Sequence, residues 1–359
     1  MPGFSPVLRC LYVTAGLIAS LATAHTCLAA PLTVGVPEFL DSSVFTQAML
    51  TPYGKAAKTS IASVAWSGRI EDLVLRRTIN GQSSDWDLVL IEGAELEQAC
   101  QNGVLDRFDL LAFRTKEQFI GAASHRCGLG AFVSSINLVY DPYRFKGRAP
   151  ENWAAFWDIK RFPGKRTLPA TARYTLEVAL LADGVVPQKI YDTLKTSEGI
   201  ERAFKKLAEI KTQIQWVASP EASLQSLSNG DATMAIGPVN RSQLLKNLQG
   251  KLLKSVANCH LYNMAFWAIP KSTARKKKAY ELVGFFTTTT RQRALLDTLG
   301  YGPTRKSISV ISSEQTAPSQ NSQVQALLID SSFWGERGSE LETRFKNWLG
   351  SSKSESAAP

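Results

Sequence analysis

The chain has 359 residues, 44% of them hydrophobic, which is enough apolar material for about two domains and excludes global disorder. Its formal net charge of +10 points toward a nucleic-acid partner, but the basic residues are spread along the chain. The one dense basic run, residues 275–278, opens an amphipathic helix and is typical of a solvated helix face. We therefore expect no nucleic-acid partner, and loose association with an anionic membrane surface is the alternative use of this charge.

The first 30 residues differ in character from the rest. They carry one charged residue, Arg9, and an apolar run of 14 residues at positions 11–24, which is too short to span a bilayer comfortably. Ala29 and Ala30 supply the small side chains that a signal peptidase recognises. We predict a signal peptide at residues 1–30, cleaved next to Ala29 or Ala30, and a mature protein in the periplasm with no membrane-spanning segment; Cys27 leaves a lipoprotein signal as the alternative.

From residue 31 onward, strand and helix patterns alternate. Strands are expected at 32–36, 61–66 and 86–91, and helices at 45–58, 68–79 and 94–102. The strand at 86–91 (WDLVLI) is almost uninterrupted by polar residues, which is typical of a parallel strand covered on both faces. This order of elements predicts a doubly wound α/β sheet.

A longer extended segment, Cys127–Asp141, follows the first half. It begins at a turn that contains Gly128, continues as an alternating run with Phe132 and Ile136 among its apolar positions, and stops before Pro142. Because one extended segment joins two α/β halves, we predict a hinge and a cleft that closes on a ligand.

The second half again alternates helices and strands. We expect, in chain order, a short helix capped by Asn152, a strand from Thr167, helices at 174–182 and 200–210, a strand at 214–217, a helix at 220–227, strands at 232–236 and 262–269, a helix at 276–287, a loop at 311–324 and a helix at 340–348. The predicted lobes are residues 31–133 with 262–306 and residues 134–261 with 307–350, followed by a disordered tail at 351–359.

Three cysteines remain after removal of the signal peptide. An exported protein enters an oxidising compartment, where a pair of cysteines forms a bridge. Cys100 lies at the end of a predicted helix and Cys127 at the start of the hinge segment, so we predict a disulfide between them. Cys259 is left over and is expected to be a buried free thiol.

No catalytic or metal-binding pattern is present. The mature chain has two histidines, His125 and His260, and it lacks zinc-protease, serine-hydrolase and phosphate-loop motifs. His125 with Cys127 forms a conceivable nucleophile pair, but a disulfide at Cys127 would remove the thiolate. No cluster has metal-ligand spacing, so we predict neither an enzyme nor a cofactor; a secreted enzyme remains the weakest alternative.

Several stretches carry a family resemblance in order along almost the whole mature chain. They are WDLV at 86–89, GVL at 103–105, CGLG at 127–130, WAAFWDIKRFPGKR at 153–166, YTLEVALLADG at 174–184, WAIPK at 267–271, YGP at 301–303, FW at 333–334 and ELE at 340–342. The chain resembles the extracellular solute-binding proteins of ABC importers, and most closely the spermidine/putrescine-binding branch. The resemblance implies two α/β lobes joined by crossover strands, a monomer that captures a small polar solute, and delivery to a permease in the inner membrane.

That fold places the ligand at the carboxyl ends of the strands. The candidate ligand-binding residues are Glu38, Phe39, Glu92, Arg173, Tyr174, Asn240, Asn263, Phe266 and Tyr301. A polyamine needs carboxylates for its ammonium groups and aromatic walls for its methylenes. The positions where the family carries such residues are here occupied by Ala94, Thr171, Tyr174, Pro238, Asn263 and Ala265. The resemblance therefore implies the scaffold while much of the polyamine-binding chemistry is replaced.

Other roles compete with ligand binding at these positions. Glu92 also suits a helix cap, and Arg173 suits an ion pair with a surface acid or, if it faces the cleft, an anionic ligand. Trp267 and Trp334 fit packing better than a ligand wall, and Arg241 fits the rim. The sequence thus leaves open a polyamine, another solute that includes an anionic one, and a ligand sensor that presents its closed form to a receptor.

Overall fold

The structure is a computed structural model that describes residues 31–355 except 39, 41, 80–85, 110–117, 146, 240–244, 257 and 309–325. Up to residue 127 the elements are β1 (Leu32–Pro37), α1 (Ser42–Phe45), the π-helical turn η1 (Thr46–Leu50), α2 (Thr51–Ala57), β2 (Ile61–Trp66), α3 (Ile70–Ile79), β3 (Leu88–Glu92), α4 (Gly93–Gln101) and β4 (Ser124–His125). The predicted signal peptide and the predicted loop at 311–324 lie outside the described residues.

The chain continues into a second group of elements. These are β5 (Gly128–Tyr140), α5 (Ala154–Trp157), β6 (Arg166–Pro169), α6 (Thr175–Ala182), α7 (Ile190–Leu194), α8 (Ser197–Ala208), β7 (Ile214–Val217), α9 (Pro220–Ser228) and β8 (Met234–Pro238). The remaining elements are β9 (Lys254–Ser255), β10 (Leu261–Ala268), α11 (Lys276–Phe286), α12 (Thr289–Leu299), β11 (Leu327–Leu328) and α14 (Ser331–Glu355). The predicted strands and most predicted helices are present within a few residues of their expected bounds.

The differences lie in the helices. The single helix expected at 45–58 consists of three consecutive helical segments with a π-helical turn in the middle. The last helix, α14, is longer in both directions than the predicted 340–348 and extends into the tail that was expected to be disordered. Helices α7 and α12 were not predicted.

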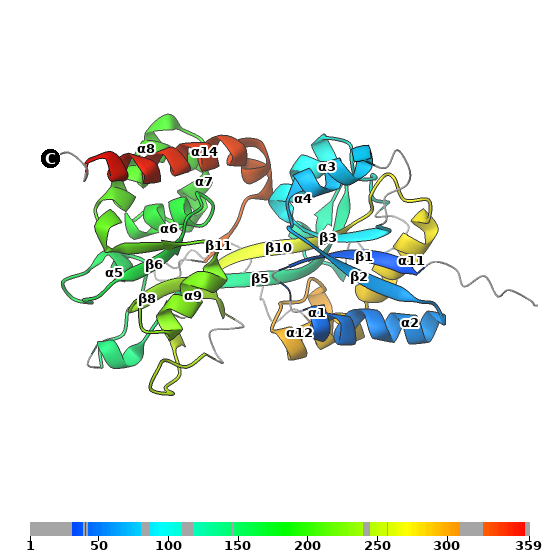
Figure 1. Ribbon diagram of the computed structural model, residues 1–359, viewed down its shortest axis with the longest axis horizontal. Helices are drawn as coiled ribbons and strands as arrows, with labels where there is room; N and C mark the ends of the chain where they lie inside the picture. The colour runs from blue at the N-terminus through cyan, green and yellow to red at the C-terminus, as the bar shows by residue number, and fades with distance from the viewer. Residues whose placement is uncertain are drawn as a thin grey trace, which may run out of the picture. The chain divides into compact units, whose positions relative to one another are not determined.

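One sheet runs through the described part of the chain in the order β2-β1-β3-β10-β5-β8-β6-β7. The strands at either end pair in parallel, as β1 does with β2 and β6 does with β7, whereas β10 and β5 in the middle are antiparallel to their neighbours. Helices cover both faces of the sheet at each end, and β5 and β10 lie side by side between the two ends (Figure 1). The molecule therefore has two α/β lobes connected by antiparallel crossover strands.

Strand β5 belongs to both lobes. Its residues Leu129–Ile136 pair with β10, and residues Ile136–Tyr140 pair with β8. Ile136 is the residue that changes partner, because it lies opposite both Leu261 of β10 and Pro238 of β8. The segment predicted as a hinge is thus a strand shared by the two lobes, with β10 as a second crossover.

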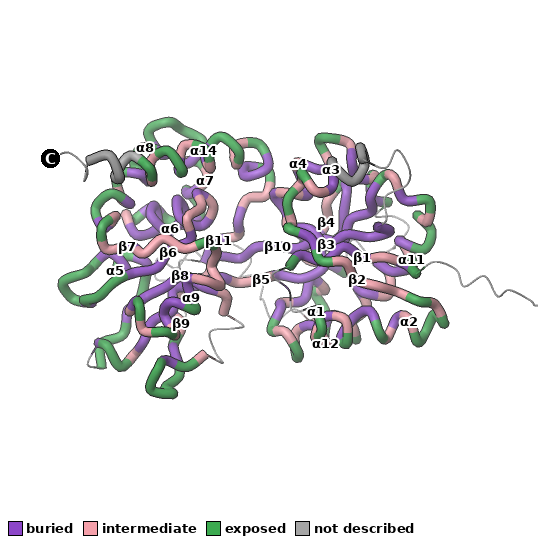
Figure 2. Tube along the Cα trace, viewed as in Figure 1, coloured by how far each residue is buried: buried purple, intermediate pink, exposed green. Residues whose placement is uncertain are grey.

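Each lobe has its own hydrophobic core. The first gathers residues of β1–β3, the start of β5, β10, α11 and α12, and the second gathers α5–α8, α14 and one face of β6 and β8. Met234 and Ile236 point into the second core, whereas Ala235 between them joins a small cluster under α9, as the alternation of side chains along a strand requires. In Figure 2 the buried part of the tube follows the middle of the sheet, whereas the outermost strands β2 and β7 are mostly half-buried.

Helix α14 crosses close to α4, from the other lobe. A Cβ atom at Gly93 would lie 2.0 Å from Ser331 Oγ, and one at Gly335 would lie 2.8 Å from Glu97 Cβ. Only glycine fits at such an approach. The crossing connects the C-terminal helix of the second lobe to the helix that follows β3 in the first lobe.

A disulfide joins Cys100 at the end of α4 to Cys127 just before β5, with a Cα–Cα distance of 5.8 Å. The bridge closes a loop with a sequence separation of 27 residues, which stabilises the fold by about 3–4 kcal/mol in the chain-entropy account. Cys259 is buried and is not part of this disulfide; its Sγ lies 4.0 Å from the backbone carbonyl of Glu151. None of the helices in the described ranges is long and apolar enough to cross a membrane.

Candidate functional site: a cleft between the lobes

A cavity of about 430 Å³ lies where the two lobes face each other. Its lining is Pro37, Ser67–Arg69, Glu92, Glu95, Ser134–Ile136, Thr171, Arg173, Tyr174, Ala218–Glu221, Pro238, Tyr301 and Glu342. Most of these residues follow or end the strands β1, β2, β3, β6, β7 and β8. In α/β sheets a crevice at the carboxyl ends of the strands is the usual place for a ligand.

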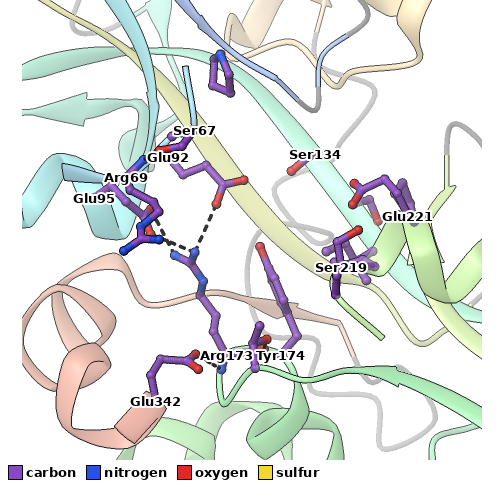
Figure 3. A pocket seen from close by; sticks show the side chains of 18 of the residues that line it. Ser67, Arg69, Glu92, Glu95, Ser134, Arg173, Tyr174, Ser219, Glu221 and Glu342 are labelled. Carbon is purple, nitrogen blue, oxygen red and sulfur yellow. Dashed lines mark hydrogen bonds and ion pairs between the residues drawn. The ribbon is translucent and has the colours of Figure 1, made fainter. Parts of the chain in front are cut away.

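Arg173 stands at the centre of the charged wall (Figure 3). Its two η nitrogens donate to the two carboxylate oxygens of Glu95, at 2.9 and 3.2 Å, and Nη2 lies 3.5 Å from Glu92. Burial opposes the positive charge, but Glu95 and Glu92 outweigh it and hold the pKa of the guanidinium above its usual range. Arg173 belongs to the second lobe and both carboxylates to the first, so this ion pair crosses the cleft.

Glu92 ends β3 and precedes α4. Its backbone occupies the N-cap position, but its side chain makes no capping hydrogen bond. Burial raises the pKa of its carboxyl to about 7, against the opposing effect of Arg173 and with further repulsion from Glu95 and Glu221. The surrounding protein groups therefore compensate the negative charge of the Glu92 carboxylate only in part.

The loop that carries Arg173 is held by residues of two other elements, α14 and β10. Glu342 of α14 accepts hydrogen bonds from the backbone N–H groups of Ala172 and Arg173, at 2.9 and 3.2 Å. The hydroxyl of Tyr174 accepts one from the buried side chain of Asn263 on β10, at 3.0 Å. Tyr174 has φ +72°, a region that non-glycine residues seldom occupy. Strain of this kind persists where the surroundings determine the conformation, and it clusters at functional sites.

The opposite wall is formed by the start of α9 and by the middle of β5. Ser219 caps α9 by accepting from Ala222 N–H, and Glu221 follows in the first turn. In Figure 3, Glu221 and Ser219 lie across the cavity from Glu92 and Glu95. Ser134 and Ser135 line it from the shared strand, with their hydroxyls hydrogen-bonded to the backbone carbonyl of Asn263 and to His260 Nδ1. This wall combines a carboxylate with several hydroxyls.

The structure separates the predicted ligand residues into groups. Glu92, Arg173, Tyr174 and Tyr301 line the cavity, and Tyr301 stacks on Phe132 with ring centroids 4.2 Å apart. Asn263 is buried behind the wall and reaches the site through Tyr174. Glu38 is exposed and Phe266 is buried against the ring of His125, so neither is among the lining residues. Phe39, Asn240 and Arg241 lie outside the described residues.

Several lining residues were not predicted. Glu95 and Glu221 each lie in the first turn of a helix, where an acidic side chain is expected on the helix dipole alone. The sequence signal for a place in the cavity wall is that both follow closely after a strand of the sheet, which most acidic residues in a first helical turn do not. Glu342 gave no such signal, because it comes from α14, 169 residues after the loop it supports.

The alternatives to solute binding find little support in these residues. Cys127 is in the disulfide, and His125 hydrogen-bonds with Glu97 at 2.7 Å, and none of these three residues lines the cavity. Within the described ranges, no group of three or more histidine, cysteine and acidic side chains is arranged to hold a metal ion. Trp267 and Trp334 are buried in the two cores, as predicted.

Comparisons with known proteins agree with this geometry. The family described as bacterial extracellular solute-binding protein matches residues 48–321. The γ-aminobutyric acid-binding protein of Pseudomonas aeruginosa is 33% identical over 308 residues, which cover 84% of this chain and 86% of that protein. The chain belongs to the bacterial extracellular solute-binding proteins. As members of this family do, it binds a small solute for an ABC permease and does not transform it.

Solved structures of solute-binding proteins share the fold. The structure of the Atu4243–GABA receptor superposes with a TM-score of 0.73 at 22% identity, covering 89% of this chain and 98% of that chain. The periplasmic binding protein MotA from A. tumefaciens B6, in complex with glucopine, superposes with a TM-score of 0.75 at 20% identity, covering 89% and 100%. The predicted two-lobe clamshell fold is confirmed.

Proposed function

We propose that this protein captures a small zwitterion, with an ammonium group and a carboxylate at opposite ends of a short chain, and that γ-aminobutyric acid is its model ligand. The observation that carries the proposal is the likeness to the γ-aminobutyric acid-binding protein, which extends over 84% of this chain. The mixed charges of the cleft support it, because the lining contains both carboxylates and guanidiniums.

The charged groups that line the cavity favour a separate place for the ammonium end and for the carboxylate end of the ligand. Glu342 is engaged by backbone N–H groups, and Glu95 is paired with Arg173. Glu92 and Glu221 then remain to face an ammonium group. The donors for a carboxylate are Arg69, which is exposed at the rim and pairs with Glu71 at 3.4 Å, and the hydroxyl of Ser219, which accepts from Ala222 N–H and keeps its own proton to donate.

A polyamine is the second candidate, and the excess of carboxylates over guanidiniums in the lining favours it. Its chemistry is less complete here, because Asn263 and Ala265 are buried in β10 where the polyamine-binding branch has cation-binding side chains. A dianionic solute fits less well than either, because the guanidinium of Arg173 is already filled by Glu95.

Calorimetric titration of the purified protein with putrescine, γ-aminobutyric acid and succinate separates these candidates, because the three compounds share a carbon-chain length and differ in their terminal charges. We expect γ-aminobutyric acid to bind more tightly than the other two by roughly tenfold or more. Tighter binding of putrescine would replace the proposal with the polyamine reading. Binding of succinate alone, or of none of the three, would contradict both.

Glu92→Gln tests the ammonium end. The change keeps the shape and removes the charge, so we expect the affinity for γ-aminobutyric acid to fall by roughly tenfold, the value typical of one lost charge-assisted hydrogen bond. Glu336→Gln, an exposed glutamate on α14, is the matched control and should leave the affinity unchanged. An unaltered affinity in the Glu92 variant would remove this residue from the site.

We further propose export as a monomer to the periplasm, with removal of residues 1–30. The low number of charges and the small residues at the end of this segment support the proposal. N-terminal sequencing of the exported protein should begin next to Ala29 or Ala30. A lipid-modified N-terminus at Cys27 would instead show an anchored protein.

A further inference from the structure

The pair formed by Glu95 and Arg173 fills the recognition face of the guanidinium. Both η nitrogens donate to Glu95, one to each oxygen, at 3.2 and 2.9 Å. This is the bidentate arrangement with which an arginine recognises the carboxylate of a ligand. Both side chains are 21% exposed, and both line the cavity. A carboxylate of the protein therefore occupies the place that a ligand carboxylate would take.

Beside this pair lie a second carboxylate, Glu92, and the guanidinium of Arg69 at the exposed rim. Glu92 lies 3.5 Å from the same guanidinium, so two carboxylates share one cation. Glu221 faces them from the other side of the cavity and adds to the repulsion felt by Glu92. The surroundings of Arg173 consequently attract an ammonium group and repel a carboxylate, although an arginine lies at their centre.

Helix α4 itself shows that the orientation of Glu95 is specific. Glu97, two residues further on, turns away from the cavity and pairs with His125 and Arg126 at 2.7 and 2.6 Å. The helix dipole stabilises an acidic side chain in the first turn of α4 whichever way the side chain points. The helix dipole therefore does not account for a side chain that reaches across to the other lobe.

We propose that Glu95 is the specificity-determining residue of the cleft: by occupying the guanidinium of Arg173, it withholds that cation from ligand carboxylates and makes this end of the cleft select an ammonium group. The inference rests on the proposed function in so far as the ligand binds in this cavity. It adds the residue that decides which terminal charge is accepted.

The test is a charge-balanced set of variants titrated with putrescine, γ-aminobutyric acid and succinate. Glu95→Gln raises the net charge of the site by one and leaves Arg173 without its bidentate partner. We expect the affinity for succinate to rise and that for putrescine to fall, each by about tenfold or more. The affinity for γ-aminobutyric acid should change less, because its two ends respond in opposite directions.

The double variant Glu95→Gln/Arg173→Gln restores the net charge of the wild-type site and removes the freed guanidinium. If the effect of Glu95 acts through Arg173, the preference for succinate gained in the single variant disappears in the double variant. Glu97→Gln breaks an ion pair of similar geometry on the same helix and should leave the order of the three affinities unchanged. Thermal melts of all variants verify that each is folded.

Two results would overturn the inference. An unchanged ratio of the affinities for succinate and putrescine in Glu95→Gln would show that the pair does not determine selectivity, and an equal loss for all three ligands in a folded variant would show that Glu95 only holds the lobes together. The proposed function fails separately, when the wild-type protein does not prefer γ-aminobutyric acid. A change in charge preference in Glu95→Gln would then still support the role of Glu95.

Discussion

Arg166 and Arg173 lie before and after the body of β6. They differ in how deeply they are buried and in the groups that accept their hydrogen bonds. Arg166 starts the strand and is fully buried, and its nitrogens donate to the backbone carbonyls of Phe156, Phe162 and Gly164 at 2.6–2.8 Å. Arg173, in the loop after the strand, pairs with the carboxylates of Glu95 and Glu92 at the cavity wall.

The pKa values of the two groups move in opposite directions. Burial lowers the pKa of Arg166 to about 10. The neutral carbonyls compensate only part of the hydration that the cation loses, and the attraction of Asp158 is weaker than the effect of burial. The pKa of Arg173 is raised, because carboxylates outweigh burial. Arg166 is thus held by carbonyls inside one lobe, whereas Arg173 is held by carboxylates at the cavity wall, where the proposal above gives it a part in the selection of a ligand.

The largest expected effect is on Arg166. Arg166→Met leaves three backbone carbonyls of the turn before β6 without their donor, so we expect a loss of about 3–5 kcal/mol in the free energy of unfolding, measured by denaturant titration. The ratio of affinities for putrescine, γ-aminobutyric acid and succinate should stay that of the wild type. A change of that ratio would break the distinction between the two arginines.

Glu177 on α6 extends the comparison to a buried acid in the same lobe. One carboxylate oxygen accepts from Trp334 Nε1 at 2.6 Å and from the Tyr191 hydroxyl at 3.0 Å, and burial raises the pKa of the carboxyl from 4.5 to about 7. The folded protein then binds this proton more tightly than the unfolded chain, so the free energy of unfolding falls as the pH rises from about 4.5 to 7.

The shift corresponds to about 3 kcal/mol. Glu177→Gln imitates the protonated acid, and we expect it to be more stable than the wild type by up to that amount at pH 8 and by little at pH 5. Denaturant titrations at these two pH values measure the difference. Equal effects at both would show that the carboxyl does not titrate in this range.

Arg173→Gln should have a smaller effect on stability than on binding. The change leaves Glu92 and Glu95 without their cation, and we expect a loss of about 1–2 kcal/mol at pH 8. The loss should shrink toward pH 5, because the pKa of Glu92 is already about 7 and the carboxyl takes up a proton there. A loss as large as that of Arg166→Met would contradict the division between structural and ligand-selecting arginines.

The smallest expected effect is that of Tyr174→Phe. Without the hydroxyl, the side-chain amide of Asn263 loses a hydrogen bond of 3.0 Å, which costs about 1 kcal/mol. The ring beside Arg173 is kept. We expect affinity for γ-aminobutyric acid to fall less than in Glu92→Gln, and the order of the two losses in calorimetry checks this ranking.

Local patterns in the sequence were sufficient for most of the fold. The apolar run of β3 and the shared strand β5 were recognised from residue type alone. Helix α12 was missed although Thr288 supplies a capping side chain, because its buried polar residue, Gln292, interrupts the apolar face. Gln292 is buried because its amide bonds with Thr304, a contact that the sequence does not reveal.

The lining of the cavity was predicted only in part. Glu92, Arg173 and Tyr174 were proposed as ligand residues because each follows a strand, and all three line the cavity. The same argument placed Glu38 there, where its neighbour Pro37 lies instead. Glu95 was missed because its partner is 78 residues away and its own position is explained by the helix dipole. Contacts between lobes depend on how two folded units meet, which local periodicity does not encode.

Strand β5 both connects the two lobes and lines the cavity between them. Any change in the angle between the lobes must twist β5 near Ile136, where its partner changes from β10 to β8. Ser134, Ser135 and Ile136 also line the cavity. On the proposed function, a solute in the cleft would contact the strand that joins the lobes, and it would stiffen this joint directly without a signal relayed through the rest of the molecule.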